Sequence, residues 1–92
     1  MKSVTINEKQ YEILEDYNSA FDKEEVESKL TDFFDQYDYI VGDWAYGKLR
    51  LKGFCEKNNK IHNNINDYKN KDNYLKEHCA FGCKYFIMKK SV

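Results

Sequence analysis

The sequence contains no proline, only four glycines and an odd number of cysteines, three. Asparagine and lysine are frequent, a bias that an AT-rich genome produces as readily as any physical requirement, so the missing proline excludes nothing. No run approaches the roughly 20 apolar residues that cross a membrane. Residues 1–5 lead into polar positions, not into the apolar stretch of a signal peptide. We therefore expect a cytoplasmic protein with no membrane segment.

The cysteine count fits this expectation. Without an export signal, an odd number leaves at least one thiol free and disfavours a disulfide framework, as in a reducing compartment. A chain of 92 residues has room for one core and not for two. We expect a single domain over residues 1–92, with an aromatic core because 16% of the residues are Phe, Trp or Tyr.

Charge is divided unevenly along the chain, although the formal net charge is only −1. Residues 1–46 carry 4 lysines against 12 acids, a net of −8, and residues 47–92 carry 11 lysines and arginines against 4 acids, a net of +7. A basic half can mark a surface for nucleic acid or for an acidic partner. The favoured alternative is that the two halves pack together and partly neutralise each other.

Two β-hairpins are predicted. The β-forming segments 4–6 and 11–14 flank a short polar loop. A second hairpin joins residues 39–41 to residues 48–54, and glycines bracket the segment between them. Because successive side chains of a strand point to opposite faces, the leucines of the 48–54 strand lie on a core face. Its cations and final phenylalanine lie on the opposite face.

A helix is predicted over residues 23–37. Asp22 is a suitable N-cap, with Glu25 as its capping-box partner. Apolar residues then recur on one helical stripe, with acidic residues on the other face. The stripe consists of Val26, Leu30, Phe33, Phe34 and Tyr37.

The C-terminal third completes the expected fold. Residues 56–66 are rich in asparagine and lack periodicity, which favours a mobile loop. A short helix is expected from about Asp67 to His78, with Asp72 available as its N-cap. Residues 81–88 are nearly continuous apolar sequence and predict a central strand buried on both faces. The predicted fold class is α+β: an antiparallel sheet of about five strands, formed by two hairpins and a C-terminal central strand, packed on one main helix with a second short helix.

Thiols and imidazoles raise the question of a metal or redox site. The candidates are Cys55, His62, His78, Cys79 and Cys83. In an extended strand the last two cysteines lie about 13 Å apart, too far to share one zinc ion unless the chain turns between them. Burial as small apolar side chains is the favoured alternative. A reactive thiol needs a cationic neighbour or a helix N-terminus, and Cys79 follows a predicted helix C-terminus.

Catalytic signatures are scarce. The sequence has no nucleophile motif, phosphate loop or dinucleotide fingerprint, so an enzyme is the less favoured interpretation and no cofactor is expected. Asp38, Asp43 and Arg50 can form a network across the second hairpin, with turn stabilisation favoured over catalysis. Trp44, between two glycines, suits a core position and an exposed partner anchor about equally.

The second hairpin is the strongest candidate for a binding surface. Its cations, with Phe54 and the nearby Tyr46, are similar to the surfaces on which sheet proteins bind single-stranded RNA, although an ordinary solvated face is favoured for a chain that is not basic overall. The leading hypothesis is a binding or regulatory module that recognises a protein or RNA partner through the 42–54 hairpin. The residues predicted to bind are Asp43, Trp44, Tyr46, Lys48, Arg50 and Lys52. The competing hypothesis is a thiol or zinc protein built on Cys79 and Cys83.

Three segments carry a family resemblance. Residues 37–44 (YDYIVGDW), 49–54 (LRLKGF) and 79–86 (CAFGCKYF) resemble the YutD-like family. The resemblance covers nearly the whole chain and implies a small cytosolic α+β protein of low-GC Gram-positive bacteria, with no characterised activity and an occasional label as a regulator. It also implies that Cys79, Cys83 and a turn at residues 42–44 belong to the family pattern. Cys55 stands where an aromatic is usual, which weakens a metal site that uses it.

Overall fold

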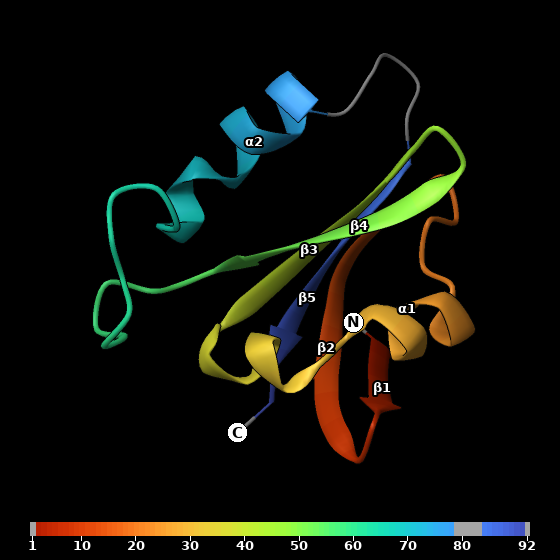
Figure 1. Ribbon diagram of the computed structural model, residues 1–92, viewed down its shortest axis with the longest axis horizontal. Coiled ribbons are helices and arrows are strands. Elements are labelled where there is room, and N and C mark those ends of the chain that lie inside the picture. The colour runs from red at the N-terminus through yellow and green to blue at the C-terminus, as the bar shows by residue number, and fades with distance from the viewer. Residues whose placement is uncertain (1, 79–83, 92) are drawn as a thin grey trace.

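Five strands form one antiparallel sheet in the order β1-β2-β5-β3-β4 (Figure 1). The computed structural model describes residues 2–78 and 84–91. The strands are β1 Lys2–Ile6, β2 Lys9–Tyr17, β3 Tyr39–Ala45, β4 Lys48–Phe54 and β5 Tyr85–Lys90. Because β5 lies between the two hairpins, the prediction of an α+β sheet with a central C-terminal strand is confirmed.

Both hairpins close through two-residue turns with left-handed backbone. Asn7 and Glu8 join β1 to β2 with φ of 51° and 71°, and Tyr46 and Gly47 join β3 to β4 with φ of 54° and 74°. Two positive φ values mark type I′ turns, whose twist matches that of the strands. The ladder therefore continues to the pair Ala45 and Lys48. The predicted turn at residues 42–44 is wrong, because those residues lie inside β3.

The first helix begins where the sequence predicts. In α1, Lys23–Lys29, the Asp22 carboxylate accepts a hydrogen bond from the Glu25 N–H at 3.3 Å. Val26 is fully buried and anchors the helix against the sheet. A side-chain cap of this kind is worth about 1 kcal/mol.

The predicted helix over residues 23–37 is too long. Leu30 is already extended, and a separate 3-10 helix, η1 Asp32–Gln36, follows. The Asn7 side chain donates to the carbonyls of Glu27 and Leu30 at 3.3 and 3.0 Å. A contact from the β1–β2 turn thus satisfies carbonyls that the end of α1 leaves without helical partners.

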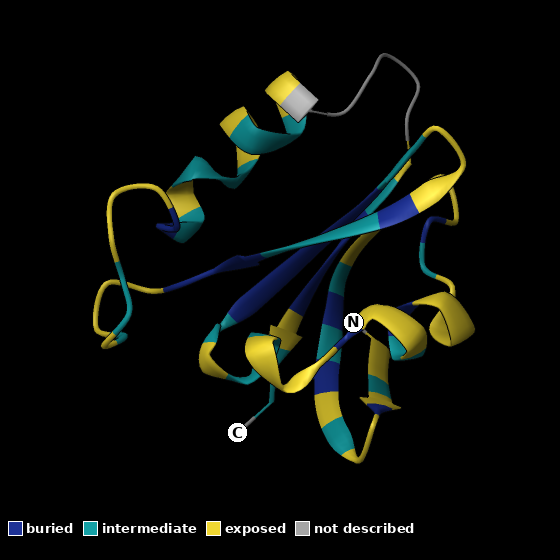
Figure 2. Ribbon diagram, in the orientation of Figure 1, coloured by how far each residue is buried: buried dark blue, intermediate teal, exposed yellow. Residues whose placement is uncertain are grey.

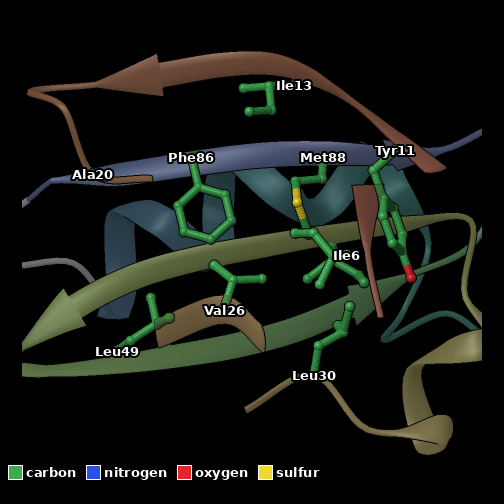
Figure 3. Packing of buried hydrophobic residues seen from close by; sticks show 10 residues of the cluster. Ile6, Tyr11, Ile13, Ala20, Val26, Leu30, Leu49, Phe86 and Met88 are labelled. Carbon is green, nitrogen blue, oxygen red and sulfur yellow. The ribbon is translucent and has the colours of Figure 1, made fainter. Parts of the chain in front are cut away.

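The sheet buries a different apolar cluster on each face. The α1 face, defined as the face that packs on α1, carries Phe86, Met88 and Leu49 (Figure 3). The opposite face, called the α2 face, is covered by the 3-10 helix η2 Tyr68–Asn70 and by α2 Lys71–His78. Its cluster comprises Tyr39, Val41, Phe54 and Ile87, with Leu14, Tyr68, Tyr74, Leu75 and Tyr85 packed against it.

The central position of β5 shows in its burial. Phe86, Ile87 and Met88 point alternately to the two faces, and each is at most 1% exposed. Figure 2 shows the buried middle of the sheet in dark blue. This confirms burial on both sides for residues 86–88 of the predicted 81–88 strand. Lys84 is exposed and precedes β5, Tyr85 is partly buried, and residues 81–83 lie outside the described residues.

The second helix is also present. The prediction that Asp72 is its N-cap is wrong, because Asp72 lies inside α2. Asp67 instead caps the preceding η2 by accepting from the Lys69 N–H at 3.0 Å.

Candidate partner-binding hairpin

The tip of the β3–β4 hairpin presents a bare aromatic ring. Tyr46 is fully exposed, at 102%, and its φ of 54° is one that bulky side chains rarely adopt. Within the described residues its ring makes no aromatic contact or hydrogen bond. Left-handed backbone at such a residue costs of order 1 kcal/mol. The Tyr46 ring itself makes no packing contact in the described part of the protein that would offset this cost.

Below the tip, two predicted contact residues face each other across the strands. Asp43 is fully buried on the α2 face, and its Oδ2 accepts from Arg50 at 2.5 Å. The register places the two residues directly opposite each other. This hydrogen bond raises the pKa of Arg50 above its ordinary value. Asp43 therefore cannot touch a partner directly in this structure, and its predicted place in a turn is wrong.

Trp44 points to the other face of the sheet. Its indole N–H donates to the Ala20 carbonyl at 2.8 Å, and the half-buried ring packs against the cluster on the α1 face. Lys84 Nζ lies 5.0 Å from the ring centroid. The choice between core and exposed anchor is thus resolved largely in favour of the core, and the indole is not presented freely to a partner.

The strand β4 has the two faces that its period predicts. Leu49 and Leu51 lie on the α1 face, and Lys48 and Lys52 lie with Phe54 on the α2 face. However, Phe54 is 1% exposed and packs edge-on against Tyr74 of α2, with ring centroids 5.8 Å apart. The predicted stacking of bases on this ring is therefore blocked by α2.

A groove lies between β4 and α2. Its volume is about 430 Å³. The lining residues are Lys52, Phe54, Ile65, Asn70, Asn73, Tyr74 and Glu77. Lys52 and Phe54 were singled out from the sequence, and the other five lining residues were missed. The sequence signal for Ile65 was an isoleucine in an asparagine-rich loop. In the structure its side chain is 76% exposed.

Asparagine and aspartate side chains hold the loop that carries Ile65. Asn66 Nδ2 donates to the Ile61 carbonyl at 2.9 Å, and Asn63 Oδ1 accepts from the N–H groups of Ile65 and Asn66 at 2.8 Å. The loop then joins the sheet through a parallel bridge between Cys55 and Asp67. The wall of the groove is therefore tied to β4 by side-chain and backbone bonds.

Asp67 makes this loop sensitive to acid. His62 Nε2 lies 2.9 Å from Asp67 Oδ2, and this hydrogen bond, joined by the Lys69 N–H, lowers the pKa of Asp67 below its ordinary 3.8. Since the folded protein takes up this proton at a lower pH than the unfolded chain, the stabilisation is complete above about pH 5 and is lost as the pH falls below 4 through the lowered pKa.

Urea unfolding at several pH values checks this expectation. Between about pH 5 and pH 3, Asp67→Asn should lose less of its free energy of unfolding than the wild type loses. Asp72→Asn is the matched control, because the Asp72 side chain is 84% exposed. Equal acid losses for wild type and Asp67→Asn would contradict the assignment.

The structure describes only some of the residues predicted to form a thiol or metal site. Cys55 is fully buried, in agreement with the favoured alternative, and burial raises the pKa of its thiol. Cys79 and Cys83 lie outside the described residues, as does the side chain of His78, so the prediction built on them stays a prediction. Among the side chains that the structure describes, no three His, Cys, Asp or Glu gather as metal ligands.

Comparison with known proteins identifies the family. Residues 5–89 match the family described as "Putative antitoxin YutD-like". The chain belongs to this YutD-like family. The "Putative antitoxin YutD" of Bacillus subtilis (strain 168) is 37% identical over 87 residues, which make up 95% of this chain and 96% of that protein. The solution NMR structure of protein yutD from B. subtilis matches with a TM-score of 0.80 and 35% identity, covering 99% of this chain and 83% of that one.

The family membership confirms the resemblance found in the sequence, and the solved YutD structure has the same α+β fold. In the described part of this YutD-like chain, no helix is both long and apolar enough to cross a membrane. What remains exposed on the β3–β4 hairpin is its tip, with Tyr46 and Lys48, and the edge of β4 with its groove.

Proposed function

We propose that this YutD-like protein is a regulatory module that binds a protein partner through the β3–β4 hairpin. The description "putative antitoxin", carried by the family and by the B. subtilis relative, supports a partner that the module binds. The observation that carries the proposal is Tyr46, a fully exposed ring on strained backbone at the hairpin tip. Exposed aromatic residues are frequent energetic centres of protein interfaces.

A protein partner fits the hairpin better than RNA does. Single-strand RNA binding uses free cations beside exposed stacking rings. Here Arg50 is paired with Asp43, and Phe54 lies under α2. Trp44 bonds to Ala20. The hairpin face therefore offers Tyr46 as its one fully exposed ring among the described residues.

Exchange of Tyr46 for asparagine separates binding from stability. Asparagine followed by glycine is the favoured pair in a type I′ turn, so Tyr46→Asn should raise the free energy of unfolding by about 1 kcal/mol. The same change removes the ring and should weaken partner binding at least about tenfold. Urea unfolding and quantitative co-purification from native lysate measure the two effects.

Phe33→Asn is the control, because Phe33 is an exposed ring, at 59%, outside the hairpin. A partner retained by Phe33→Asn and lost by Tyr46→Asn supports the proposal. A partner that Tyr46→Asn retains at full strength overturns it. So does tight binding of single-stranded RNA whose affinity falls steeply between low and high salt, because that dependence reports phosphate contacts.

A further inference from the structure

One edge of the sheet is open beside the groove. The Trp44 N–H donates to the Lys84 carbonyl at 3.1 Å on the β5 side, so the backbone of its neighbour Asp43 faces β4. Its partner Arg50 consequently faces β3, and alternate residues of β4 face away from the sheet. The outward residues are Leu49, Leu51 and Gly53. Within the described part of the chain, their outward N–H and C=O groups make no hydrogen bond.

The protein itself covers the far end of this edge. Cys55 continues the outward series, and its N–H donates to the Asn66 carbonyl at 2.7 Å while its carbonyl accepts from the Tyr68 N–H at 3.0 Å. These bonds form the parallel bridge between Cys55 and Asp67. A segment of extended chain is thus already paired beside the end of β4, and the edge is open from Leu49 to Gly53.

The groove lies where side chains of an added strand would point. On the α2 face it is walled by Phe54, Tyr74 and Ile65, next to the covered end of the edge. Figure 1 shows α2 to one side of the sheet. A large apolar side chain from a strand paired with β4 would enter the groove against these three residues.

Charge selects the kind of strand. Lys48 and Lys52 lie on the α2 face of β4, and neither forms an ion pair with any residue in the ranges 2–78 and 84–91. Opposite charges on directly facing residues stabilise paired strands, and like charges destabilise them. A second copy of this chain would bring the same lysines to its own β4, so edge-to-edge pairing of two β4 strands is disfavoured.

We infer that the partner contributes an extended acidic segment, which adds to the sheet as a strand beside β4. Its acidic side chains face Lys48 and Lys52, and one large apolar side chain fills the groove beside Phe54. This inference rests on the proposed function, because it takes the partner to be a protein. Strand addition of this kind obtains affinity from backbone bonds and specificity from the side chains that enter pockets.

Random short peptides displayed on phage and selected against the intact protein test the inference without a known partner. The enriched peptides should combine two acidic residues about four positions apart, matching the spacing of Lys48 and Lys52, with one large apolar residue on the same face. Their binding should fall at least about tenfold in Leu51→Pro, which removes an outward N–H that no β3 bond uses. Leu51→Ala is the matched control, since it loses the same packing and keeps the N–H.

Amide hydrogen exchange of the wild-type protein provides a second test, and this test does not depend on whether a variant folds. A bound peptide should slow exchange at Leu49, Leu51 and Gly53, and should leave Arg50 and Lys52 nearly unchanged because β3 already protects them. Failure to enrich any peptide overturns strand addition, as do peptides that bind Leu51→Pro as tightly as Leu51→Ala or leave the outward amides unprotected. A co-purified partner that needs Tyr46 but tolerates Leu51→Pro would overturn strand addition alone and leave the proposed function standing.

Discussion

Replacing Gly42 by alanine is expected to lower the free energy of unfolding by about 3 kcal/mol, the largest loss we anticipate from a single added methyl group. A Cβ at this position would lie 2.2 Å from Phe86 Cζ and 2.3 Å from its Cε2. Phe86 is fully buried in the central strand (Figure 3). Its ring packs edge-on against Phe21, with ring centroids 5.3 Å apart. Because the ring is fully buried, it cannot shift toward solvent to make room for the new methyl group. Urea unfolding measures the loss.

Gly53→Ala is the matched control on the neighbouring strand. Its Cβ would also be crowded, at 2.3 Å from Tyr37 Cγ. Tyr37, however, is half-buried at the end of η1, so its ring can shift toward solvent, and we expect a loss of about 1 kcal/mol. Phe86→Leu added to Gly42→Ala should recover part of the larger loss. Equal losses for the two glycine variants would contradict the assigned role of Phe86.

Arg50→Ala is expected to destabilise the protein by about 3 kcal/mol, because it leaves the buried Asp43 carboxylate without its cation. The Asp43 side chain is fully buried, whereas the Arg50 side chain is 40% exposed. The loss of stability should therefore come chiefly from the buried Asp43 carboxylate that is left unpaired, and not from the removal of the arginine side chain. Asp43→Asn combined with Arg50→Ala should recover much of it, since a neutral amide is less costly to bury than a charge.

A double-mutant cycle measured by urea unfolding checks this pair. We expect a coupling energy above about 1 kcal/mol between positions 43 and 50. Lys48→Ala is the control cation on the same strand and should change stability by less than about 0.5 kcal/mol, because Lys48 is exposed. A cost for Arg50→Ala as small as that for Lys48→Ala would show that the ion pair behaves as an ordinary surface pair.

Much of the sheet could be predicted from local sequence. Period two and the turn residues locate both hairpins, and the apolar C-terminal run predicts a central strand. The end of α1 could not be found in this way. Its apolar stripe continues through Phe34, but the carbonyls at the helix end are satisfied by Asn7, a residue 20 or more positions earlier. A helix boundary set by such a distant contact leaves no local signal.

The candidate site was predicted less well, for a related reason. Alternation in β3 and β4 separates two faces but does not reveal what covers them. Trp44 and Arg50 have internal partners, and α2 lies over Phe54. The groove depends on α2 and on Ile65, which are brought to β4 by the Cys55–Asp67 bridge. Tyr46 and Lys48 alone among the predicted contact residues are classed as exposed.

Photo-cross-linking from the hairpin tip tests the account most directly. A photoreactive phenylalanine analogue is placed at position 46 of the intact protein in cells and, separately, at position 33, since both native rings are exposed. We predict a discrete cross-linked protein from position 46 and none from position 33. Cross-linking from position 33 but not from position 46, or cross-linking of position 46 to RNA alone, would contradict a protein-binding role for the β3–β4 hairpin.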